Sequence, residues 1–396
     1  MRRQSPLPVP TCLLLCTLTT ALCQGVPTMP ENDLPKMTYE QGLAQIPDRE
    51  LPGFWFGDVR GLTARWEALQ RGQARLIAIS PGGRPIHVVT FGAYENVRGA
   101  ANFNSAIGGR DASAYMNKAE RDRPVVLFLG PVHGQEVENL TGLVNLIEVM
   151  ESGRDLRGKD QPELRALGDR CRLVIIPQAN PDGIARFAPR CSAGELSEGR
   201  FPWGMGTLSD GGQLVWPYSK LQHPMVGDNV GFPGCYFNDA GVNPMHDDFL
   251  DPMGPEAPAV LKVAKEEGPD LAVSLHSHSY PPAVLRPAYV TIEVQQEAAE
   301  LARRLYALLR ERGLPGGNPD ADPFQASADG GEYPAPFNLT SAIYHISGAS
   351  SFTFECPHGF ADDKFCTVTI EQILDIQLTL YEAMLRHALE NKGGDG

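Results

Sequence analysis

The sequence has few basic residues, and after its first 23 positions it has no long apolar run. Its 396 residues include 34 Lys and Arg against 48 Asp and Glu, which gives a formal net charge of −14. The lack of a long apolar run argues against a stable membrane span. The acidic balance argues against nucleic acid and anionic membranes as partners. The hydrophobic content of 42% is that of a globular chain.

Cysteine is also scarce, and its eight copies show no Cys-x-x-Cys spacing, which argues against a cysteine-ligated zinc site. If the protein is exported, two disulfide bonds are candidates: one between Cys191 and Cys235, and one between Cys356 and Cys366. An odd number of cysteines follows residue 23, so at least one thiol stays free. An equally good interpretation is that all of these cysteines are buried thiols and form no disulfide bond.

The first 23 residues are typical of a secretory signal peptide. Arg2 and Arg3 form a basic start, residues 12–20 an apolar core, and residues 21–23 a tolerable cleavage site. The apolar core is too short to span a bilayer. We therefore predict export to a secreted or periplasmic location, and losing the two arginines would change the formal charge from −14 to −16.

The fold class follows from the alternation of short apolar runs with helical patterns. Residues 24–59 are predicted to be an N-terminal extended segment, and residues 60–392 a single α/β domain with a mixed central sheet flanked by helices. The strands read as continuous apolar runs, which indicates that helices cover both faces of the sheet. The predicted strands are 74–80, 85–91, 124–130, 171–178, 271–276 and 351–355, and the first two form a hairpin. The predicted helices are 137–152, 255–267, 291–312 and 368–390.

Two segments show no clear period. Residues 95–122 are predicted to be loop, and residues 184–250 a long irregular loop region. The second segment is rich in glycine, proline and aromatic residues, including Trp216 and Tyr236. Long irregular segments in a compact domain are usually functional or disordered. The aromatic residues favour a functional loop.

Four residues at the ends of apolar strands carry the chemistry. His133 and Glu136 follow one strand, three positions apart, so both can point at one metal ion. His276 ends a second strand and Glu355 a third, and open α/β sheets place their sites at such ends. Each residue alone is ambiguous, but two histidines, a glutamate and a further carboxylate predict a catalytic zinc site and hydrolysis. Gly134 should let the backbone turn sharply beside the ligands.

In this order the motifs resemble those of the zinc carboxypeptidases of the M14 type, over roughly residues 60–390. The matching segments are His133–Glu136, Asn180–Gly183, Pro255–Ala257, His276–Ser279, Ile343–Gly348 and Ser351–Glu355. The resemblance implies a carboxypeptidase-like fold that binds one Zn²⁺ per chain through His133, Glu136 and His276. It also implies a peptide or peptide-like substrate, cleaved at a C-terminal amide bond.

The resemblance further implies roles in the reaction. Zinc activates a water molecule, and Glu355 is the general base that takes its proton and passes it to the leaving amine. Tyr344 hydrogen-bonds the substrate near its C-terminal end. An arginine after the Asn180–Gly183 turn stabilises the oxyanion; Arg186 is preferred over Arg190 and Arg200 because it is nearest to the turn.

The sequence differs from the family pattern at the residues that bind the substrate's terminal carboxylate. Within the run Gly241–Phe249, Met245 and His246 occupy the positions where the family has an Asn-Arg pair, and a histidine does not replace the guanidinium. Nearby Asp247 and Asp248 should favour protonated His246, so a free-carboxylate preference should grow as the pH falls from 8 to 6. An amidase or deacylase acting on another amide, and a non-catalytic binding protein, therefore remain alternatives.

Overall fold

The computed structural model describes the chain outside residues 1–38, 45, 47–48, 198–200, 217, 325–335 and 394–396. The predicted signal peptide, residues 1–23, and Arg200 lie outside the described residues. Every described residue falls within one compact unit, Leu34–Gly396. Among the described residues, no helix combines the length and the apolar character needed to cross a membrane.

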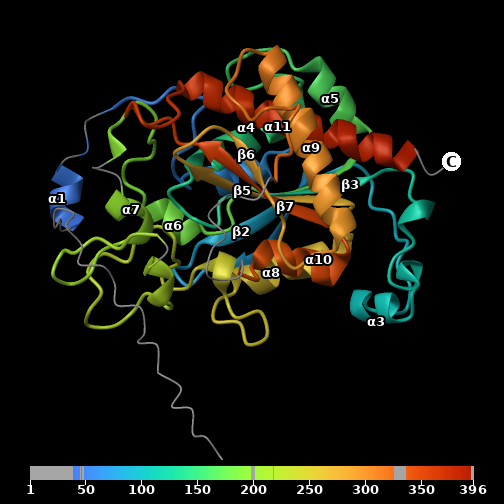
Figure 1. Ribbon diagram of the computed structural model, residues 1–396, viewed down its shortest axis with the longest axis horizontal. Helices are drawn as coiled ribbons and strands as arrows, with labels where there is room; N and C mark the ends of the chain where they lie inside the picture. The colour runs from blue at the N-terminus through green and yellow to red at the C-terminus, as the bar shows by residue number, and fades with distance from the viewer. Residues whose placement is uncertain are drawn as a thin grey trace, which may run out of the picture. The chain divides into compact units, whose positions relative to one another are not determined.

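A seven-stranded mixed sheet lies at the centre of this unit (Figure 1). The strands are β1 (Gln73–Ile79), β2 (Pro85–Phe91), β3 (Val125–Leu129), β4 (Arg172–Ile176), β5 (Leu271–His278), β6 (Ala283–Leu285) and β7 (Ser350–Pro357), in the spatial order β1-β2-β4-β3-β5-β7-β6. β4, β3, β5 and β7 run parallel to one another, and the remaining strands pair antiparallel. The predicted α/β class, mixed sheet and initial hairpin are confirmed.

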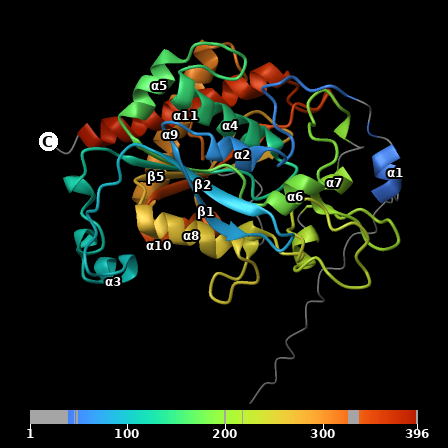
Figure 2. The same cartoon turned by 180° about the vertical axis from the view of Figure 1, so that it is seen from behind.

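Helices cover both faces of the sheet, as the views from opposite sides show (Figures 1 and 2). One layer contains α4 (Val137–Ser152), α5 (Pro162–Asp169), α9 (Ile292–Glu311) and α11 (Ile370–Gly393). The other contains α8 (Glu256–Glu267) and α10 (Leu339–Ser347). The shorter helices are α1 (Tyr39–Ala44), α2 (Leu62–Glu67), α3 (Phe103–Gly108), α6 (Pro181–Arg186) and α7 (Phe201–Met205).

The alternation of side chains along β3 explains why its sequence is apolar throughout. Val126 and Phe128 point into the core beneath α4 and α11. Val125, Leu127 and Leu129 point into the second core, which α8 and α10 cover. Both sides of the strand are therefore buried, and a polar residue at any of these positions would lose its water without gaining a partner.

The segments predicted to be irregular contain short elements that the sequence did not indicate. In the described part of 24–59, which was predicted to be extended, residues 39–44 form α1, and Phe54 and Trp55 are buried in the main core. Residues 95–122 contain α3 and two 3₁₀ turns around a small apolar cluster. Within 184–250 the described chain has α7, short 3₁₀ turns and isolated bridges. Short elements held by tertiary packing leave too little periodicity to be recognised.

The candidate disulfides are not formed. Cys191, Cys235, Cys356 and Cys366 each keep a thiol group. Burial raises the pKa of the Cys235 thiol to about 12, which disfavours the reactive thiolate. Cys235 therefore packs as a small apolar side chain.

Candidate active site

The loop after β3 places the first two site residues. His133 lies in this loop, and Glu136 is the N-cap residue from which α4 begins. Gly134 lies between them against the start of α6, where a Cβ atom would be 1.9 Å from the carbonyl carbon of Gly183. The chain does turn here, because the N–H of Glu136 donates to the carbonyl oxygen of His133 at 3.1 Å. Close packing is a second reason for glycine at this position, whose φ is not in the left-handed region.

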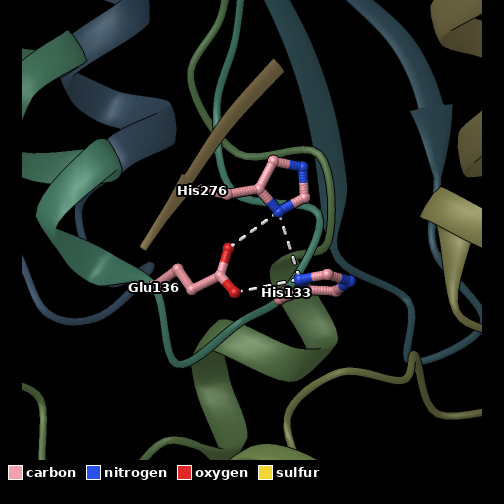
Figure 3. A group of neighbouring side chains, drawn as sticks. All are labelled: His133, Glu136 and His276. Atoms are coloured by element: carbon pink, nitrogen blue, oxygen red, sulfur yellow. Dashed lines mark hydrogen bonds and ion pairs between the residues drawn. The ribbon is translucent and has the colours of Figure 1, made fainter. Parts of the chain in front are cut away.

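His276 comes from β5 and meets the other two side chains in a buried cluster (Figure 3). The Nδ1 atom of His133 lies 2.9 Å from Oε1 of Glu136, and Nδ1 of His276 lies 3.1 Å from Oε2 of Glu136. The two Nδ1 atoms are 3.2 Å apart. One donor atom from each residue falls within 4.8 Å of the others, so a single ion can contact all three.

Glu136 dominates the electrostatics of this cluster. Burial lowers the pKa of His276, but the charge and hydrogen bond of Glu136 outweigh it and raise this pKa. Burial raises the pKa of Glu136, but the charges and hydrogen bonds of His133 and His276 outweigh it and lower this pKa to about 2. Burial lowers the pKa of His133 despite the neighbouring carboxylate. Glu136 is therefore ionised. Oε2 of Glu136 is in ion-pair contact with Nδ1 of His276 at 3.1 Å and has no further partner among the described residues, which leaves it able to bind a metal.

Neighbouring side chains hold the two imidazole rings in place. The Ser274 hydroxyl lies 3.0 Å from Nε2 of His276, on the side of the ring away from Glu136. The ring of Tyr236 stacks on His133, with centroids 3.8 Å apart and planes inclined by 7°. Contacts of this kind orient metal ligands. The sequence marked Tyr236 only as an aromatic residue of the irregular loop, with no signal for this role.

Glu355 lies beside His276 because the two residues are partners in the pairing of β5 with β7. Both side chains line a cavity of about 570 Å³. Burial and the charge of Glu136 raise the pKa of Glu355 to about 7, and the neighbouring imidazoles of His276 and His358 oppose the shift. His358 lines the same cavity and pairs with the buried carboxylate of Glu138, at 3.2 Å.

The structure does not bring Tyr344 or Arg186 to this cavity. The Tyr344 ring packs edge-on against Phe103, with centroids 5.9 Å apart. The Arg186 guanidinium donates to the carbonyl oxygens of Gly234 and Phe237 and pairs with Asp239. Neither side chain is among the described residues that line the cavity, so neither is placed to contact a substrate there.

His246 does line the cavity, but its predicted charge state is wrong. Burial, together with the charges of Lys220 and neighbouring histidines, lowers the pKa of His246 to about 3. The carboxylate of Asp247 instead accepts backbone N–H groups of Asp248 and Met253, each at 2.8 Å. His246 is therefore neutral between pH 6 and 8 and offers a substrate no charge.

Two cations at the cavity were not predicted. Lys220 and Arg286 are the described lining residues that carry a positive charge at neutral pH. Lys220 follows Trp216 in the irregular region that the sequence marked as functional. No motif indicated either residue, because their place at the site depends on how the loops pack.

Comparison with known proteins identifies the class of site. The family model described as zinc carboxypeptidase matches residues 67–210, a segment that contains His133, Glu136 and the Asn180–Gly183 turn. A search of curated proteins gave no match. The family match confirms the predicted resemblance to the zinc carboxypeptidases over this segment of the chain.

Among solved structures, a carboxypeptidase from Burkholderia mallei is similar at 15% identity and a TM-score of 0.49, over 83% of this chain and 66% of that one. A metallo-carboxypeptidase from Burkholderia cenocepacia is similar at 16% identity and a TM-score of 0.48, over 84% of this chain and 68% of that one. Bovine thrombin-activatable fibrinolysis inhibitor is similar at 14% identity and a TM-score of 0.46, over 83% of this chain and 94% of that one. The chain thus spans about two thirds of the length of the two bacterial proteins.

Proposed function

We propose that the protein is an exported, zinc-dependent hydrolase that cleaves a C-terminal amide bond of a peptide. The observation that carries the proposal is the convergence of His133, Glu136 and His276 beside Glu355 in one cavity. Three buried donors with a separate carboxylate next to them match the needs of a metal-dependent hydrolase. Export rests on the signal-like sequence of residues 1–23.

The donor set fits one zinc ion per chain. His133, Glu136 and His276 supply two nitrogen ligands and one carboxylate, which leave room for a fourth ligand from solvent or substrate. A zinc ion bound here supplies a Lewis acid, which polarises a carbonyl group and lowers the pKa of water. Ser274 and Tyr236 keep the imidazole rings oriented toward the shared position.

Glu355 is the proposed general base. Its carboxylate accepts a proton from the attacking water and then donates that proton to the leaving amine. Without a metal its pKa is raised to about 7 by burial and by Glu136. Positive charge at the neighbouring ligand cluster lowers that pKa, because it stabilises the carboxylate. A bound cation would thereby keep Glu355 ionised, and able to accept a proton, at neutral pH.

An amidase or deacylase activity is the second candidate. It is favoured by the neutral state of His246 and by the engagement of Arg186 with Asp239, because neither residue gives the cavity a cation for a terminal carboxylate. The same metal cluster and base would then act on an amide that has no free carboxylate beside it.

The test compares hydrolysis by the zinc-loaded protein of three substrates: a blocked dipeptide with a free C-terminus, the same dipeptide amidated, and an N-acylated amine. The proposal expects turnover of the free-carboxylate dipeptide that disappears on chelation and returns with added zinc. Turnover confined to the other two substrates would establish the amidase or deacylase alternative. If the zinc-loaded protein hydrolyses none of the three, the hydrolase proposal fails for these substrate classes.

A further inference from the structure

The active-site cavity has two cations that the proposed reaction does not use. Arg286 is one of the lining residues, and Nε of its guanidinium donates to the Gln295 side chain at 2.9 Å in an exposed bond. Lys220 lies in the short 3₁₀ turn Tyr218–Leu221, and its ammonium group sits over the Trp216 ring, 5.5 Å from the centroid. Arg286 is therefore hydrogen-bonded to an amide side chain, whereas Lys220 contacts an aromatic ring.

Lys220 has no carboxylate partner among the residues that the structure describes. This sets it apart from cavity residues that are already paired, such as His358 with Glu138. The side chain keeps solvent exposure, but the surrounding protein removes enough water to lower its pKa. An ammonium group that has lost part of its hydration gains more from an incoming anion than a fully hydrated one does.

The charge of Lys220 acts on the interior of the cavity. It contributes to the lowering of the pKa of His246, which occupies the position where the resemblance expects an arginine. Lys220 therefore lies near enough to influence the part of the cavity where a substrate carboxylate would be expected. The replacement of that arginine by a neutral histidine leaves a place for a cation from another part of the chain.

The balance of charge in the cavity supports an anionic substrate. Glu136 and Glu355 are its two acidic lining residues among those described, and a bound divalent ion would offset both. Lys220 and Arg286 then give the cavity a positive excess inside a strongly acidic protein. Such a local excess attracts an anion to the site and away from the rest of the surface.

We propose that Lys220 binds a carboxylate of the substrate and thereby takes the place of the missing arginine. The inference rests on the proposed hydrolase function and adds the residue that recognises the substrate. Trp216 holds the ammonium group by a cation–π contact until the carboxylate arrives. The carboxylate is either the free C-terminus or an acidic side chain of the last residue, and the experiment separates these two sources.

Binding is measured first, in the Glu355→Gln protein, so that the result does not depend on turnover. Calorimetry on the zinc-loaded protein compares N-benzoylglycyl-phenylalanine, its C-terminal amide, and the amidated peptide that ends in aspartate. Lys220→Met is expected to weaken binding of the free-carboxylate peptide by about tenfold or more, and binding of the phenylalanine amide by less than twofold, consistent with a charge-assisted contact. Lys220→Arg should recover most of the loss.

The amidated aspartate peptide assigns the source of the carboxylate. If the C-terminus is the ligand, this peptide binds like the phenylalanine amide in both proteins. If the side chain is the ligand, it is the amidated aspartate peptide that depends on Lys220. Lys364→Met is the matched control, since that ammonium lies over the Phe365 ring at 5.0 Å, and Lys364 does not line the cavity.

Kinetics in the Glu355-containing protein give a second test. Lys220→Met should raise KM for the free-carboxylate peptide more than it lowers kcat, because binding is lost and the base is intact. Equal losses on all three peptides, or unchanged binding of all three in Lys220→Met, would overturn the inference. Carboxylate binding that depends on Lys220 without any turnover would support the inference and count against the hydrolase proposal, so the two failures are distinguishable.

Discussion

His276 and Glu355 are direct neighbours across the parallel pair β5 and β7, where their Cα atoms are register partners. The third metal-binding candidate and the candidate base are therefore held at one level of the sheet by backbone hydrogen bonds. A slip of one residue in this pairing would move one of the two side chains to the opposite face. The apolar residues that precede them, Leu275 and Phe354, are fully buried and oppose such a slip.

Removal of any of the three donor side chains should abolish tight zinc binding. His133→Ala, Glu136→Ala and His276→Ala each leave two protein ligands, which is fewer than catalytic zinc sites use. Zinc content after dialysis against a weak chelator is the measurement, with near one zinc per chain expected for the wild type. His278→Ala is the matched control, because it lies two residues along β5 but outside the cluster, and it should retain zinc. Full zinc in His276→Ala would contradict the assignment.

Glu355→Gln should keep zinc and the fold but lose most activity. The substitution preserves the shape of the side chain and removes its ability to accept a proton. General-base catalysis contributes roughly 10²–10⁴-fold, so kcat should fall by at least about 100-fold. Zinc content and the thermal midpoint, both unchanged, serve as controls. A fall of less than tenfold in kcat would mean that another group is the base.

His246 should not create a pH-dependent preference for free carboxylates. Its pKa is lowered to about 3, so the imidazole stays neutral throughout the range from pH 6 to 8. The ratio of kcat/KM for free and amidated peptides, measured at pH 6, 7 and 8, should have the same pH dependence in the wild type and in His246→Ala. A preference that grows toward pH 6 in the wild type and disappears in His246→Ala would show that His246 is protonated there.

Gly134→Ala should destabilise the protein and disturb the metal cluster. The new Cβ would lie 1.9 Å from the carbonyl carbon of Gly183 and 2.2 Å from the backbone nitrogen of Ile184, so main-chain atoms must move. Overpacking of this kind costs about 1–3 kcal/mol. Gly108→Ala is the control, because nothing lies within 4 Å of its Cβ position. Denaturant unfolding should show a loss for Gly134→Ala only, together with weaker zinc binding.

Glu256 should make the protein less stable as the pH rises. Burial raises its pKa from 4.5 to about 7, although Asn238 donates a hydrogen bond to it at 3.0 Å. The folded protein thus binds a proton that the unfolded chain releases above pH 4.5. Its contribution to stability is therefore present below about pH 4.5 and is lost as the pH rises to about 7.

The variant Glu256→Gln stays uncharged and should avoid this loss. Its free energy of unfolding relative to the wild type should increase between pH 4.5 and 7.5, by a few kcal/mol at most. Glu300→Gln, at an exposed position of α9, is the control, and its difference should stay small. An unchanged difference for Glu256→Gln across this range would show that Glu256 is ionised in the folded protein.

The fold and the core of the site could be predicted because they depend on local patterns. Continuous apolar runs predict strands that are buried on both faces, and β3, β5 and β7 are such strands. Parallel strands of one sheet bring their carboxyl ends to the same edge. Residues that follow those strands or lie near their carboxyl ends, such as His133 and His276, therefore meet even though 143 positions separate them.

Which side chains line the cavity and could bind the substrate became clear only from the tertiary structure. Tyr344 and Arg186 carry motif-like sequence contexts, but Tyr344 packs on Phe103 and Arg186 on the loop around Asp239. Lys220 has no motif, yet it lines the cavity. The direction of a loop side chain depends on contacts with distant segments, which no local pattern contains. The sequence alone thus determined six of the seven strands and the candidate metal ligands near their ends, because apolar patterns are local. The short strand β6 and the cations that face the substrate depended on how distant segments pack, which no local pattern contains.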